Sequence, residues 1–229
     1  MKKFFFLVFS CCLFMCLLTA QKAQPLISSI AFGSCASEKK PQPVLDLVVK
    51  HKPDLFVYLG DNIYGDTYDM KELQAKYDSL AAKPEYQRLK KAVPIVATWD
   101  DHDYGWNDSG KEYPFKKESK EIFMNFFDVP DDSDRRNHDG IYTSYIYEGK
   151  GRRVQLILLD NRTFRSKLRN YRGEYNQESK FFYPLDYYPH EIEDSALLGE
   201  EQWQWLEEEL KKPADLRIIG SGSQFSIFV

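Results

Sequence analysis

The chain has 229 residues, of which 43% are hydrophobic and 15% aromatic, enough for a sizeable core in one large α/β domain. Acidic and basic residues are spread along the sequence and give a formal net charge of -4. This distribution contains no basic stripe that would neutralise a phosphate backbone, so nucleic acid is not expected as a required partner.

The N-terminal segment has the layout of a secretory signal. Lys2 and Lys3 precede an apolar run over residues 4–18, and small and polar residues follow. A run of roughly fifteen residues is short for a membrane span. We therefore expect a signal peptide over residues 1–20, no stable span after its cleavage, and a periplasmic or secreted protein.

A lipoprotein signal is the alternative interpretation of this segment, with Cys16 as the lipid attachment site. Bulky Phe14 and Met15 stand where such signals have small residues, so we favour cleavage without a lipid anchor. Three of the four cysteines lie in the segment. The exported domain would keep only Cys35 and could form no internal disulfide.

The first half of the domain alternates short apolar runs, which predict strands, with segments of helical spacing. Strands are expected over residues 26–33, 55–59 and 94–98, and helices over residues 44–52, over 70–82 and from Pro84 onward. This alternation indicates right-handed crossovers and a largely parallel sheet.

The second half predicts a helix, a hairpin, a long irregular segment, a helix and a strand. These elements are expected over residues 116–127, over 142–147 paired with 153–159, and over 166–198, 199–210 and 216–219. Trp203 and Leu206 would form the apolar side of the last helix. The irregular segment is long enough to predict an insertion or lid.

Polar clusters follow four of the expected strands, at residues 33–35, 60–66, 100–108 and 160–162. The carboxyl ends of parallel strands meet at one edge of a sheet, where ligands usually bind. A binding site is therefore expected at this edge.

Two of these clusters contain candidate metal ligands. Asp61 stands at a strand end, where a carboxylate can bind hard cations, and Tyr64 could bring a phenolate to the same side. Asp101 would be a ligand in the second cluster, with His102 facing the substrate as a general acid or charge stabiliser, oriented by Asp103. The alternatives are a turn-capping aspartate and a solvated acidic loop.

Cys35 has several interpretations: a buried hydrophobe, a surface thiol, a metal ligand or a nucleophile with His102 as base. The acids beside His102 favour metal ligation over nucleophilic catalysis. Arg162 and Arg165 offer guanidinium groups suited to a phosphate ester, although ordinary surface ion pairs would explain them equally well. Asn62 and Asn107 are further candidates for substrate contacts.

Four strings together resemble the PhoD-like alkaline phosphatase family within the calcineurin-like metallophosphoesterases. They are Phe32-Gly33-Ser34-Cys35, Gly60-Asp61-Asn62-Ile63-Tyr64-Gly65, Thr98-Trp99-Asp100-Asp101-His102-Asp103 and Asp160-Asn161-Arg162-Thr163-Phe164-Arg165. The resemblance covers about residues 27–224. It implies an α/β metallophosphatase sandwich, two facing sheets with flanking helices, over a domain at residues 26–229.

The resemblance also implies the chemistry of the site. Iron would be bound by Cys35, Asp61 and Tyr64, and calcium would share Asp61 and take Asp101. His102 would stand beside the leaving group of a small phosphomonoester or phosphodiester. The expected protein is an exported, metal-dependent phosphoesterase.

One departure from the family pattern changes this expectation. The family has further metal-binding strings after the region of residues 218–224, and no histidine follows His190 here. We therefore expect the C-terminal part of the domain to be missing, with an incomplete metal site and exposed apolar surface. A catalytically inactive remnant that binds phosphate esters is the alternative function.

Overall fold

The computed structural model describes residues 24–170, 187–188, 190 and 194–224. The expected signal peptide and most of the expected insertion lie outside this described part. Within it, no helix has the length and apolar character needed to cross a membrane.

The first sheet is three-stranded and fully parallel, in the order β2-β3-β4. Its strands are β2 (Ile30–Gly33), β3 (Leu55–Leu59) and β4 (Ile95–Thr98), and its helices are α1 (Val44–His51), α2 (Met70–Ala81), α3 (Pro84–Ala92), α4 (Asp101–Tyr104) and α5 (Lys116–Phe126). Local sequence sets the helix ends: Asp69 accepts the Lys71 N–H at 2.8 Å at the start of α2, and Pro84 occupies the first turn of α3.

The second sheet is mixed, in the order β1-β5-β6-β9, with antiparallel pairing only between β5 and β6. Its strands are β1 (Gln24–Pro25), β5 (Thr143–Gly149), β6 (Arg152–Leu158) and β9 (Leu216–Gly220). The remaining elements are the 3-10 helix η1 (Asp134–Arg136), the short strands β7 (Arg169–Asn170) and β8 (Tyr187–Tyr188), and the helix α7 (Gly199–Lys211).

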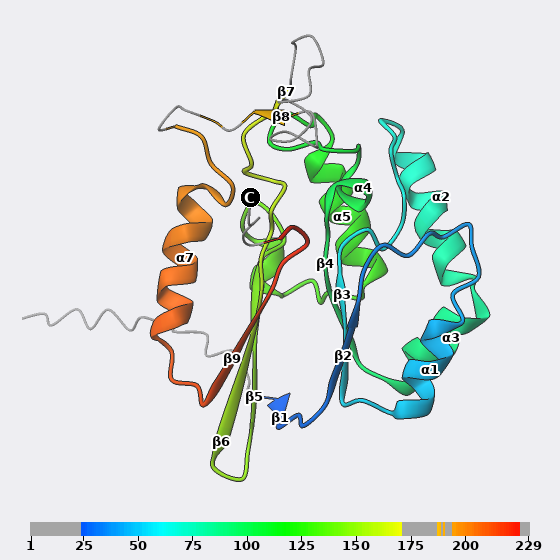
Figure 1. Ribbon diagram of the computed structural model, residues 1–229, viewed down its shortest axis with the longest axis vertical. Helices are drawn as coiled ribbons and strands as arrows, with labels where there is room; N and C mark the ends of the chain where they lie inside the picture. The colour runs from blue at the N-terminus through cyan, green and yellow to red at the C-terminus, as the bar shows by residue number, and fades with distance from the viewer. Residues whose placement is uncertain (1–23, 171–186, 189, 191–193, 225–229) are drawn as a thin grey trace, which may run out of the picture.

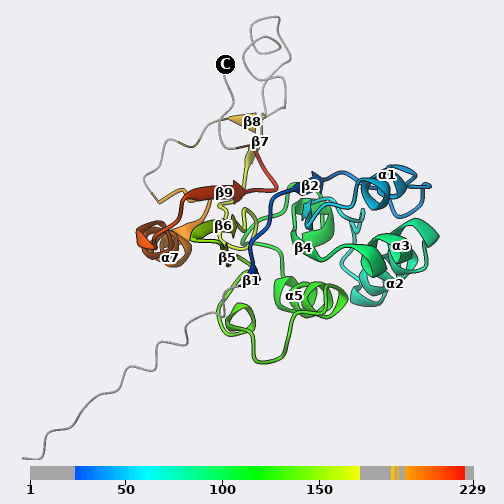
Figure 2. The ribbon, with the colours of Figure 1, turned by 90° about the horizontal axis from the view of Figure 1, so that it is seen from below.

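The two sheets face each other and helices cover their outer sides, as Figures 1 and 2 show. Leu55 and Val57 of β3 meet Leu156 and Leu158 of β6 in the core between the sheets. A larger aromatic core joins the first sheet to its helices, and a third, smaller core joins β6 to α7. The expected two-sheet sandwich with flanking helices is confirmed.

The orientation of α7 differs from the prediction. Leu206 is buried as expected, but Trp203 is 51% exposed. Gln202 fixes the helix by accepting the Asp160 N–H and donating to the Asp160 carbonyl, both at 2.8 Å. The buried stripe therefore runs through Gln202, Leu206 and Glu209, and Trp203 faces outward. Leu210 on α7 and Leu216 and Ile219 on the edge strand β9 are also exposed.

Gly60, directly after β3, has no room for a side chain against the backbone that follows β4. Its φ is +102°, and a Cβ there would lie 2.6 Å from Asp100 Cβ and 2.7 Å from the Asp100 backbone nitrogen. We expect Gly60→Ala to lower the free energy of unfolding by about 2–4 kcal/mol, measured by urea denaturation, because overpacking adds to the strained φ.

Gly151 provides the matched control. Its φ is +71°, and a Cβ there would have no atom within 4 Å. Gly151→Ala should therefore cost only the conformational strain, about 1 kcal/mol. If both substitutions lowered the free energy of unfolding equally, the close approach of Gly60 to Asp100 would not be what makes Gly60→Ala destabilising.

Candidate metal centre

The candidate site lies at the carboxyl ends of β2, β3 and β4, where backbone hydrogen bonds join three loops. The N–H groups of Cys35 and Ala36 donate to the carbonyls of Gly60 and Asp61 at 3.2 and 2.9 Å. The Gly65 N–H donates to the His102 carbonyl at 2.9 Å. The three polar clusters predicted from the sequence are thus brought together.

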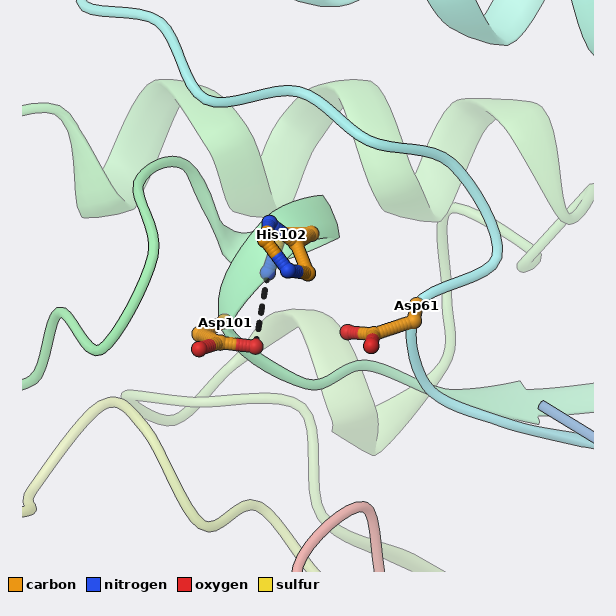
Figure 3. A group of neighbouring side chains, drawn as sticks. All are labelled: Asp61, Asp101 and His102. Atoms are coloured by element: carbon orange, nitrogen blue, oxygen red, sulfur yellow. Dashed lines mark hydrogen bonds between the residues drawn. The ribbon is translucent and has the colours of Figure 1, made fainter. Parts of the chain in front are cut away.

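Asp61, Asp101 and His102 form a group that could hold a metal ion. Each offers one ligand atom, and the three atoms lie within 4.8 Å of one another. Figure 3 shows Asp101 and His102 at the start of α4 with Asp61 opposite them, after β3. The carboxylate oxygens of Asp61 and Asp101 suit a divalent or trivalent cation, and the His102 imidazole lies next to them.

The two other expected metal ligands lie beside this group. The Cys35 thiol is exposed and donates to Asp61 Oδ2 at 3.6 Å. The Tyr64 ring centroid is 4.3 Å from that of His102. The structure therefore brings together Cys35, Asp61, Tyr64, Asp101 and His102.

Backbone strain is concentrated at this site. Cys35, Asp61, Asp66 and Asp108 all have φ between 43° and 58°, the left-handed region that residues other than glycine rarely adopt. Such conformations persist where surrounding contacts hold them, and they are typical of functional sites.

The carboxylate of Asp61 has little compensation for its charge. Burial, reinforced by the neighbouring Asp101 and Asp100, raises its pKa to about 6. Its Oδ1 is buried and has no hydrogen-bond partner among the described residues. A cation would supply the missing partner, so the donor set fits a bound metal.

Asp101 has an environment that favours its ionised form. Burial opposes ionisation, but the Arg162 guanidinium and the Asp108 N–H, which donates to Asp101 Oδ2 at 2.7 Å, lower its pKa below the ordinary value. Burial and the negative charge of Asp61 raise the pKa of Tyr64 to about 12. A phenolate at Tyr64 would therefore require a nearby cation.

His102 is oriented by Asp66, a residue that sequence reasoning missed. Its Nδ1 lies 2.8 and 2.9 Å from the two carboxylate oxygens of Asp66. Asp66 also accepts the Asn107 N–H at 2.9 Å. Burial lowers the pKa of His102, but the hydrogen bond to Asp66 and the charge of Asp101 outweigh it and raise the pKa above the usual value.

Asp103 does not orient His102, so that prediction was wrong. It is fully buried, and its Oδ1 accepts the N–H groups of Asp61 and Asp100 at 3.3 and 2.6 Å. Its Oδ2 accepts the backbone N–H of Asn62 at 3.2 Å and the side-chain amide of the same residue. Asp103 therefore joins the two segments that carry the candidate metal ligands Asp61 and Asp101.

Asn62 does not face a substrate either. Its side chain is fully buried and donates to Asp103 and to the Thr98 carbonyl, the latter at 2.9 Å. The side-chain amide is therefore committed to joining the ends of β3 and β4.

The remaining candidates for substrate contacts lie around the site. Arg162 is buried and forms a salt bridge with Asp100, and its Nη2 lies 3.8 Å from Asp101 Oδ1. Arg165 is buried and donates to the Asp108 carbonyl. Asn107 is exposed. Substrate binding by these three residues stays a prediction.

A family model described as PhoD-like phosphatase matches residues 30–229. The chain belongs to the PhoD-like phosphatase family. The expected family is therefore confirmed, and all four sequence strings lie within the matched range.

A solved structure titled "Structure of PhoD" has the same fold as this PhoD-like chain, with a TM-score of 0.64 and 19% sequence identity. The similarity covers 86% of this chain and 42% of the solved chain. This chain thus spans less than half of the solved protein. No curated protein matches the sequence.

The contact between Asp66 and His102 can be tested in the PhoD-like chain without any substrate. Asp66→Asn keeps a residue that tolerates positive φ but removes the negative charge, so the pKa of His102 should fall, measured by NMR titration of the imidazole. Asp46→Asn, on α1 and paired with Arg88, is the control and should leave this pKa unchanged. An unchanged pKa in Asp66→Asn would contradict the assignment.

Proposed function

We propose that this PhoD-like chain is an exported, metal-dependent phosphoesterase that acts on phosphomonoesters or phosphodiesters. The observation that carries the proposal is the group of Asp61, Asp101 and His102 at the strand ends of a PhoD-like fold. The family supports phosphate esters as the substrate class.

The donor set supports the choice of metals. Cys35, Asp61 and Tyr64 offer thiolate, carboxylate and phenolate groups that suit iron, and the oxygens of Asp61 and Asp101 suit calcium. Asp61, whose buried Oδ1 has no partner in the part of the chain that the structure describes, would be shared between the two. Bound metals would polarise the phosphoryl oxygens and neutralise charge in the transition state.

The side chains around the metals have separate tasks in this proposal. Asp66 engages Nδ1 of His102, which leaves Nε2 to hold the proton that the leaving-group oxygen needs. The Tyr64 ring packs against the imidazole and limits its rotation. Arg162 offsets the charge of Asp100, which lowers the repulsion felt by an incoming phosphate.

Nucleophilic catalysis by Cys35 has less support. The thiol donates to the Asp61 carboxylate, and the His102 imidazole, which would have to act as the base, is engaged by Asp66. The arrangement instead suits joint ligation of one cation by both residues.

A protein that binds phosphate esters without hydrolysing them is the second candidate. The observation that favours it is that the described residues bring together one group, Asp61, Asp101 and His102, that could hold a cation and through it a phosphate ester.

Turnover of bis(p-nitrophenyl) phosphate with iron and calcium present tests the proposed function. Asp61→Asn and Asp101→Asn should each lower kcat/KM by more than about 100-fold, because each removes a metal ligand. Asp46→Asn changes an exposed carboxylate on α1 and should retain full activity. Metal content, measured by mass spectrometry, should fall in the two site variants only.

The outcomes separate the two candidates. Metal and phosphate-ester binding without turnover would favour the binding protein. Turnover and metal content that are unaffected by both site substitutions would overturn the proposed centre.

Export is supported by Lys2 and Lys3 and by the apolar run over residues 4–18. When the full chain is expressed with a functional secretion system, its mature mass should correspond to loss of about the first 20 residues. Retention of the intact N-terminus would contradict export by cleavage.

A further inference from the structure

Two exposed aromatic side chains stand on the segments that meet at Asp66, the residue that contacts His102. Tyr68 and Trp106 are 51% and 43% exposed. Their ring centroids are 5.3 Å apart, with an interplanar angle of 29°. We call this pair the aromatic platform. Single exposed aromatics are common, but a stacked pair next to a reaction centre is a candidate binding surface.

The platform is connected to His102 through Asp66. Tyr68 follows Asp66 by two residues, and Trp106 directly precedes Asn107, whose N–H donates to Asp66 Oδ1 at 2.9 Å. The same carboxylate oxygen lies 2.8 Å from His102 Nδ1. One side chain thus links the loop of each platform residue to the imidazole expected beside the leaving group.

The platform also has a rigid support. Tyr68 rests on Tyr113, which is almost fully buried, at a centroid distance of 5.4 Å. The Tyr113 hydroxyl donates to the Thr67 carbonyl at 2.6 Å, and the Thr67 N–H donates to the Gly105 carbonyl at 2.8 Å. A Cβ at Gly105 would lie 2.2 Å from the Tyr113 ring, so this close support requires glycine.

We propose that the aromatic platform binds the leaving group and selects phosphate esters whose leaving group is a planar aromatic ring. The inference rests on the proposed function, because it assigns the platform to the substrate of that same centre. Preorganised rings favour a planar partner through stacking, which a saturated ring of similar size cannot provide. The selection acts on the leaving group and leaves phosphate recognition to the metal centre.

Binding of phenyl phosphate and cyclohexyl phosphate tests the proposal, because the two monoesters have the same charge and similar size. Dissociation constants are measured by calorimetry on the full, metal-loaded chain. Phenyl phosphate should bind more tightly, and Trp106→Ala should weaken it about tenfold while changing cyclohexyl phosphate little. Tyr68→Ala should have the same selective effect.

Two further variants control for size and for exposure. Trp106→Leu keeps an apolar side chain without a ring and should lose the preference, whereas Trp106→Phe should keep most of it. Trp203→Ala removes from α7 an aromatic residue that is as exposed as Tyr68, at 51%, and should change neither constant. Circular dichroism confirms that each variant is folded.

Equal affinity for the two esters, equal weakening of both by Trp106→Ala, or no measurable binding of phenyl phosphate would overturn the proposal. Hydrolysis is measured separately. If the chain prefers phenyl phosphate but hydrolyses neither ester, the platform is supported and the proposed activity is contradicted. If the chain hydrolyses both esters and binds them equally, the proposed activity is supported and the platform is contradicted.

Discussion

The crowding of carboxylates at the ends of β3 and β4 is the constraint on which the rest of the site depends. Asp61 follows β3, whereas Asp100, Asp101 and Asp103 follow β4, and the four carboxylates have different polar partners. Asp103 receives four N–H donors, Asp100 is paired with Arg162, and Asp101 accepts the N–H groups of His102 and Asp108. Asp61 is left with a buried oxygen that has no partner among the described residues, and this oxygen is where a cation would bind.

This compensation comes from both sheets, so the site depends on their packing against each other. Arg162, which balances Asp100, follows β6 of the second sheet, whereas Asp100 follows β4 of the first. Near this ion pair, the Thr98 hydroxyl donates to the Leu159 carbonyl at 2.7 Å. The apolar core between β3 and β6 keeps the two sheets together and so keeps these groups within contact distance. Loss of packing between the sheets would therefore separate the arginine from the acids that it balances.

The sequence predicted the elements well because their signals are local. Apolar runs marked β3 and β4, and Pro84 marked the start of α3. The clustering of Cys35, Asp61 and Asp101 also followed from strand order, since parallel strands bring their carboxyl ends to one edge.

The directions of side chains within the loops could not be predicted in the same way. Asp101 and Asp103 stand two residues apart on the single helical turn of α4, and such positions point to nearly opposite sides. Asp103 therefore enters the interior, where it holds Asn62, while Asp101 faces the site. Asp66 contacts His102 from a backbone with a φ of +43°. Aspartate adopts this conformation only occasionally, so the residue type alone does not predict it.

The segment from Gly65 to Tyr68 connects the candidate metal centre to the aromatic platform. Backbone bonds from Gly65 to the His102 carbonyl and from Thr67 to the Gly105 carbonyl hold this segment along α4. Between these two bonds Asp66 meets the imidazole, and directly after them Tyr68 stacks on Trp106. Both contacts lie on the segment that these two backbone bonds hold, so the same bonds position Asp66 and Tyr68. A leaving group bound to the platform would then be held by the same segment that orients the imidazole.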